Sequence, residues 1–179
     1  MPARATSLTG AAGEHYVAYC LSSLGYPTAL TRGGSPTVDI IVGDLSGHKS
    51  VMIQVKTSNW AWRERKRKPQ ESVWQWDVGA KAKTLKGKNI FYCFVDLRSG
   101  NNLEAKPCVY VVPSIDVANR MGPDWSRYMF WITLDEEKKY IENWSLITDA
   151  LSNDISIAPI VAMAGEVPQT IIPPLSTNE

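Results

Sequence analysis

The chain has 179 residues, of which 44% are hydrophobic and 21% charged, a composition typical of one soluble globular domain. No apolar run approaches the ~20 residues of a membrane-spanning helix, and no secretory signal is evident at the start MPARATSLTG. We therefore expect a cytoplasmic protein whose three widely spaced cysteines are reduced. With only two histidines, an ordinary zinc site is not expected.

The net charge of +1 conceals an uneven distribution along the chain. Residues 61–90 carry nine Lys or Arg against three acidic residues, so the remainder of the chain is net negative. A basic segment on an otherwise acidic chain indicates a polyanionic partner. A solvated basic loop is the alternative interpretation.

The first third of the chain predicts a helix followed by a β-hairpin. Apolar residues recur at helical spacing over residues 9–24, and Gly25 ends that helix. A short strand is expected over 26–31, and a turn at Gly33-Gly34. Two β-branched stretches, 37–42 and 50–56, flank the turn sequence GDLSGHK and predict paired strands.

The rest of the chain predicts a mixed α/β sheet. A polar, basic loop or extended arm is expected over 58–72. The remaining expected elements are a helix over 78–86, a strand covered on both faces over 89–97 and parallel to 50–56, a strand over 108–112, a helix over 114–120, an edge strand over 128–133 and a helix over 136–151. We predict one domain over 1–151, with a basic insertion at about 58–76, and an extended or disordered tail over 152–179.

Glu14 is the first polar residue at a position where the pattern asks for an apolar one. It lies on the same predicted helix face as Val17 and Leu21, and no capping box accounts for it because Ala11 stands three residues before. A buried carboxylate needs a partner, so Glu14 is expected to face a cation or a polar cleft. The alternative is a helix that begins later and leaves Glu14 in solvent.

Asp39, Gln54 and Lys56 belong to the two predicted strands. Asp39 lies within TVDIIV, although Asp is depleted in strands, and an edge-strand or turn position would also explain it. Gln54 and Lys56 are two residues apart, so they share one face of the strand, a pair that alternation alone produces often. A hairpin over 37–56 would bring Asp39 beside this pair, with Glu14 above from the helix.

Together these four residues indicate a metal site on a phosphodiester hydrolase. Two carboxylates and the amide oxygen of Gln54 form an all-oxygen ligand set suited to Mg²⁺ or Mn²⁺. Lys56 beside them would neutralise a phosphate or position a water molecule.

The segments GEHYVAYCLSSLGY, VDIIVG and VMIQVKTS resemble the core of the PD-(D/E)xK nuclease superfamily, and are most similar to its Holliday-junction-resolvase-like and type IV restriction-like branches. The resemblance covers about residues 9–97. It implies a restriction-endonuclease-like α/β core, a central mixed sheet flanked by helices, and DNA cleavage with Mg²⁺ or Mn²⁺. It also implies that Glu14, Asp39 and Gln54 bind the metal and that Lys56 is catalytic.

Two positions depart from the superfamily pattern. Val38 stands where a Pro precedes the motif Asp, and Gln54 replaces the acidic residue of the third motif. Some branches similar to this one carry Gln and are regarded as active. An amide oxygen is a weaker ligand than a carboxylate, so weaker metal affinity is expected.

The basic segment follows the strand of Gln54 and Lys56 directly. We predict that Lys and Arg side chains track phosphates and that Trp60 or Trp62 stacks on a base. The predicted nucleic-acid-binding residues are Trp60, Trp62, Arg63, Arg65, Lys66, Arg67, Lys68, Lys81 and Lys83.

Three functions are compatible with the residues. The leading hypothesis is a metal-dependent DNA endonuclease, with RNA as an open alternative substrate. The second is a nucleic-acid-binding protein on the same fold that no longer cleaves, and the third an unrelated α/β protein whose polar residues are solvated. Cutting both strands would favour a homodimer, for which the apolar stretch 107–134 offers an interface.

Overall fold

A computed structural model of the protein describes residues 3–31, 38–98, 104–123 and 125–152. Its larger sheet has five strands in the order β1-β2-β3-β6-β7. The strands are β1 (Thr28–Leu30), β2 (Ile40–Gly43), β3 (Ser50–Ser58), β6 (Ile90–Asp96) and β7 (Cys108–Pro113). The sheet is mixed, because β3 and β6 run parallel while the other neighbours run antiparallel.

A smaller antiparallel sheet has the order β4-β5-β8. Its strands are β4 (Trp62–Arg63), β5 (Val73–Asp77) and β8 (Met129–Thr133). The helices are α1 (Ala3–Ser23), α2 (Ser114–Asn119), α3 (Glu137–Tyr140) and α4 (Ser145–Ser152), with short 3-10 turns η1 (Pro69–Glu71) and η2 (Ala80–Lys83).

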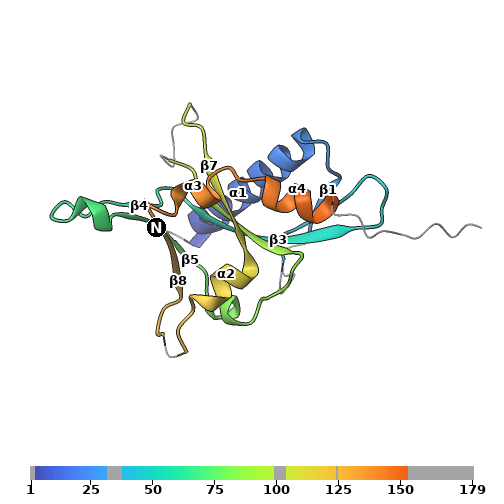
Figure 1. The fold of residues 1–179 in the computed structure, drawn as a ribbon. Helices are drawn as coiled ribbons and strands as arrows, with labels where there is room; N and C mark the ends of the chain where they lie inside the picture. The colour runs from blue at the N-terminus through green and yellow to red at the C-terminus, as the bar shows by residue number, and fades with distance from the viewer. Residues whose placement is uncertain (1–2, 32–37, 99–103, 124, 153–179) are drawn as a thin grey trace, which may run out of the picture.

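The elements form three layers, with the large sheet in the middle. Helices α1 and α4 lie on one side of β3, β6 and β7, and α2 with β5 and β8 lies on the other (Figure 1). Alternate residues of β6 enter two different cores, with Phe91 and Cys93 on the side of α1 and Tyr92 and Phe94 on the side of the small sheet. Strand β6 is therefore covered on both faces, as its continuous apolar sequence predicts.

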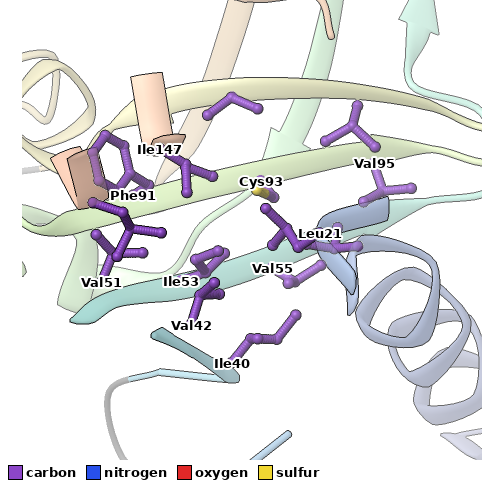
Figure 2. Close-up of a cluster of buried hydrophobic side chains, with 14 residues drawn as sticks. Leu21, Ile40, Val42, Val51, Ile53, Val55, Phe91, Cys93, Val95 and Ile147 are labelled. Carbon is purple, nitrogen blue, oxygen red and sulfur yellow. The ribbon is translucent and has the colours of Figure 1, made fainter. Parts of the chain in front are cut away.

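Figure 2 shows the core between α1, α4 and the sheet. Leu21 from α1 and Ile147 from α4 are fully buried against inward-facing residues such as Ile53 and Val55 of β3. Burial of apolar side chains of this size contributes roughly 1.5–3 kcal/mol each, so this core fixes how α1 lies on β3. That placement determines where the polar residues of both elements meet.

The structure confirms most of the predicted elements. The central mixed sheet flanked by helices is present, as are the antiparallel β2–β3 hairpin, the parallel β3–β6 pair, the β7 strand, the α2 helix and the β8 edge strand. Helix α1 begins at Ala3, earlier than residue 9. Strand β2 begins at Ile40, so Asp39 lies immediately before the strand rather than inside it.

Two predictions about secondary structure are wrong, and one strand was not predicted. The expected helix over 136–151 is interrupted after Tyr140, where Glu142 has a φ of 47° and its N–H donates to the Val109 carbonyl at 2.7 Å. Pairing with β7 thus overrides helix propensity there. The expected helix over 78–86 is only the 3-10 turn η2. Strand β5, whose Trp76 is buried, was not predicted.

Two predictions fall on residues outside the described ones: the turn at Gly33-Gly34 and, apart from Ser152, the tail over 152–179. Across the described part of the chain, no helix has the length and apolarity needed to cross a membrane.

Candidate functional site

Asp39 continues the β2–β3 ladder with its side chain. Its backbone N–H donates to the Ile53 carbonyl at 2.8 Å, and its carboxylate Oδ2 accepts the Val55 N–H at 2.7 Å. The carboxylate thus takes the place that a backbone carbonyl of a longer β2 would occupy. This bond explains why an Asp is stable next to a strand and fixes its side chain over β3.

The Asp39 carboxylate also accepts a hydrogen bond from Nε2 of Gln54. Among the described residues both donors use Oδ2, which leaves Oδ1 for a further partner. A Glu at position 54 would place a second carboxylate against Asp39, whereas the neutral amide makes the contact favourable. Gln54 and Lys56 lie on one face of β3, opposite Tyr92 and Phe94 of β6 in the register.

Glu14 reaches this region because α1 lies very close to β3. Gly13 is buried, and a Cβ placed there would overlap Oγ1 of Thr57 and lie 2.9 Å from its Cβ. Only glycine permits this approach. Glu14 is half-buried in the middle of α1, so the alternative of a solvated residue at a helix start is wrong.

The four predicted residues line one cleft of about 730 Å³. Glu14 comes from α1, Asp39 from the residue before β2, and Gln54 and Lys56 from β3. These segments are far apart in the sequence. The cleft is also lined by Thr9, Gly10, Val55, Thr57, Ser58, Asn59, Trp60, Arg63 and Asp77.

The electrostatics of the cleft disfavour two bare negative charges. Burial and the nearby charge of Asp39 raise the pKa of Glu14 above its ordinary value, while His15 and Lys56 oppose the shift. Burial likewise raises the pKa of Asp39, opposed by the Val55 N–H and by Lys56. Both carboxyl groups therefore hold protons more tightly than in water, and a cation in the cleft would relieve the cost of ionising them.

The donor set of the cleft fits Mg²⁺ or Mn²⁺. Glu14 and Asp39 offer carboxylate oxygens, and Gln54 offers an amide oxygen. Among the described residues no three His, Cys, Asp or Glu side chains form a cluster that could hold a metal ion. The site would thus offer the two carboxylates of Glu14 and Asp39. That number suits Mg²⁺, which keeps several water molecules and takes further ligands from substrate phosphates.

The basic segment forms an arm, residues 62–74, that projects from the body of the protein (Figure 1). Strand β4 pairs with β5 at its base, and η1 lies near its tip. Arg65, Lys66, Arg67 and Lys68 surround a hollow of about 290 Å³ together with Glu71. Nζ of Lys68 lies 2.7 Å from Glu71, whereas Lys66 and Arg67 have no ion pair within the described residues.

Trp60, just before the arm, and Trp62, at its base, have different environments. Trp60 is 53% exposed and lines the cleft. Trp62 packs on Trp74 of β5, with ring centroids 4.5 Å apart, and so anchors the base of the arm. Arg63 also lines the cleft, and its Nη1 donates to the Trp60 carbonyl at 2.6 Å. The geometry therefore separates Trp60, which faces the cleft, from Trp62, which has a structural contact.

The two lysines of η2 also differ. Lys81 lines a second hollow that shares Gln54 and Lys56 with the cleft. Lys83 instead donates to the Pro123 carbonyl at 2.7 Å and lies over the ring of Tyr128. Of these two predicted residues, only Lys81 lies beside the cleft.

The chain matches no protein-family model, and no curated protein is similar to it in sequence. Among solved structures, a bacterial homing endonuclease, I-Ssp6803I, matches with a TM-score of 0.54 and 18% identity, over 81% of this chain and 93% of that chain. The chain shares its fold with a homing endonuclease. At this identity the likeness concerns the backbone fold and assigns no role to any residue.

Two residues important to the site were not predicted from the sequence. Gly13 sets the distance between α1 and β3, and Tyr92 lines the second hollow beside Gln54. Gly13 stands four residues before Val17 on the core-facing stripe, a position where glycine indicates close packing. Tyr92 lies within a continuous apolar strand and carried no such signal.

Proposed function

We propose that this protein is a metal-dependent endonuclease that hydrolyses DNA phosphodiester bonds, of the PD-(D/E)xK type. The observation that carries the proposal is the convergence of Glu14, Asp39, Gln54 and Lys56 on one cleft from three separate segments. The resemblance of the sequence motifs to that superfamily and the fold shared with a homing endonuclease support it.

In this proposal Glu14, Asp39 and Gln54 hold Mg²⁺ or Mn²⁺. The bound cation would activate a water molecule and stabilise charge that develops on the phosphate. Asp39 is oriented by the Val55 N–H, so its Oδ2 is fixed and its Oδ1 would be the oxygen offered to the cation. Lys56 lies in the same cleft and supplies a positive charge for a non-bridging phosphate oxygen.

The substrate is proposed to be DNA because of the arm and of Trp60. Four consecutive basic residues at the tip of the arm would contact phosphates outside the cleft. Trp60 lies between the arm and the cleft and offers an exposed ring for stacking.

A second candidate is a DNA-binding protein on the same fold that does not cleave. The hydrogen bond from Gln54 to Asp39 favours it, because Gln54 there contacts the neighbouring ligand with its nitrogen rather than facing a cation with its oxygen. Gln54→Glu would distinguish the two. A cleaving enzyme cuts without the substitution, whereas a protein that has lost its metal requires it.

The deciding experiment is cleavage of supercoiled, linear, branched and single-stranded DNA, and of single-stranded RNA, with Mg²⁺, Mn²⁺ or EDTA. We expect metal-dependent cutting that Asp39→Ala and Lys56→Ala each reduce by about 100-fold or more. Asp135→Ala and Lys49→Ala are matched controls for charge removal, since both residues lie outside the cleft. Salt-dependent DNA retention without cutting would support the second candidate. Absence of both DNA binding and DNA cutting would refute both candidates.

A further inference from the structure

A second hollow, of about 630 Å³, adjoins the cleft at Gln54 and Lys56. Its other walls come from residues 78–85, which follow β5 and include η2, and from Tyr92 of β6. Its volume lies within the range of about 300–1,000 Å³ typical of pockets for small organic ligands. The proposed hydrolysis of a phosphodiester does not require this space.

The walls suit a flat, partly polar ring. Val78, Ala80 and Leu85 are apolar, and Thr84 and Gln54 can hydrogen-bond. Tyr92, almost wholly buried, closes the hollow next to Gln54.

The position of Lys56 links the hollow to the cleft. Lys56 lines both, so a phosphate held at its ammonium would carry its own nucleotide next to the hollow. A phosphate and its base are joined through one sugar, and these neighbouring spaces have that order. Lys81 adds a second cation to the wall of the hollow.

We propose that this hollow receives the base of one unpaired nucleotide whose phosphate lies at Lys56. The inference rests on the proposed function and defines its substrate class. A base in a duplex must leave the stack to enter such a pocket, which costs a few kcal/mol and least where the base is mismatched or single-stranded. The preferred substrate is therefore DNA with an unpaired nucleotide beside the scissile phosphate.

The test uses duplexes that carry 2-aminopurine, either paired or opposite a mismatch, bound to the full chain with Ca²⁺ in place of Mg²⁺. Emission of 2-aminopurine rises when the base leaves the stack. We expect a severalfold rise with wild type, strongest for the mismatched duplex, and none with Ala80→Trp or Thr84→Trp. Residues 80 and 84 are exposed at the wall of the hollow, so a large ring there fills it without entering the core.

Leu45→Trp is the matched control, because Leu45 is 84% exposed in the β2–β3 hairpin and lines neither the cleft nor the second hollow. This variant should bind DNA and extrude 2-aminopurine as wild type does. In parallel, cleavage with Mg²⁺ should be about tenfold faster beside a mismatch than in a perfect duplex, a preference lost in Ala80→Trp.

The two readouts separate the two proposals. Cutting without any rise in emission would overturn the pocket while the nuclease stands. A rise that Ala80→Trp abolishes, without cutting of any DNA, would support the pocket and overturn the nuclease. No rise on any duplex overturns the pocket, whether or not DNA is retained.

Discussion

A Cβ on Gly13 of α1 would overlap Oγ1 of Thr57 on β3 and lie 2.9 Å from the Thr57 Cβ. The two elements therefore touch where residue 13 has no side chain. Thr57 Oγ1 is buried there without a hydrogen-bond partner among the described residues, so the contact is one of packing. The next residue of the helix is Glu14, and the close approach brings its carboxylate into the cleft.

Gly13→Ala should therefore impair both the fold and the site. Overpacking costs about 1–3 kcal/mol, which the better helix propensity of Ala offsets by at most about 1 kcal/mol. We expect a net loss of stability in urea unfolding and a larger loss of cleavage, because α1 must move away and take Glu14 with it. Gly10→Ala is the control for stability, since a Cβ there meets no atom within 4 Å. Equal stability and cleavage of the Gly13 variant and wild type would contradict the packing argument.

The raised pKa values of Glu14 and Asp39 predict how pH acts on the metal-free protein. A carboxyl whose folded pKa lies above its unfolded value stabilises the fold at low pH, and that contribution is lost as pH rises through the folded pKa. At neutral pH the ionised pair is thus a cost. Glu14→Gln should raise the melting temperature without metal, by removing one of the two charges.

Mg²⁺ should offset the stability advantage of Glu14→Gln over wild type. Wild type is expected to gain thermal stability on addition of Mg²⁺, and Glu14→Gln to gain less, because one ligand has lost its charge. The pKa values of Glu14 and Asp39 are raised above their ordinary values of 4.5 and 3.8. Cleavage by wild type should therefore begin to fall at a pH above these ordinary values, as the two carboxylates become protonated. Identical Mg²⁺ shifts in both proteins, measured by calorimetry, would exclude Glu14 as a ligand.

Trp60→Ala and Trp62→Ala should affect different properties, DNA binding and stability respectively. Trp62 packs on Trp74, so its loss is expected to cost about 1–3 kcal/mol and to loosen the arm. Trp60 is 53% exposed, so its removal should leave stability within about 0.5 kcal/mol and weaken DNA binding instead. Chemical unfolding and DNA titration on the same two proteins measure both effects. Unchanged DNA affinity in Trp60→Ala would remove this residue from the proposed interface.

The tip of the arm should determine the salt dependence of DNA binding. Removing one cation that neutralises a phosphate makes the slope of log K against log salt shallower by about 1. Lys66→Ala and Arg67→Ala should each do so, and more than Lys68→Ala, because Glu71 already neutralises part of the Lys68 charge. Lys49→Ala, in the β2–β3 hairpin at the opposite end of the molecule from the arm (Figure 1), should leave the slope unchanged. Slopes equal to that of wild type in all four variants would show that the arm does not contact phosphates.

Local sequence patterns were sufficient for elements whose residues determine their own conformation. The alternation of SVMIQVK and the turn before it predict the β2–β3 hairpin, and the apolar run at 89–97 predicts a strand covered on both faces. The long segment 136–151 was mispredicted, because Glu142 pairs with β7 and no local pattern shows that partner. Strand β5 was missed for a related reason, since it is stabilised between β4 and β8.

The sequence by itself determined which residues have the chemistry for a metal site: two carboxylates, an amide and a lysine, with their order along the chain. It also determined that Gln54 and Lys56 share a face, because side chains alternate along a strand. Only the tertiary structure decided that Glu14 joins them, since that depends on contact between Gly13 and Thr57, 44 positions apart in the chain. It alone decided that Trp60 faces the cleft while Trp62 does not, because the environment of a ring is set by neighbours distant in sequence.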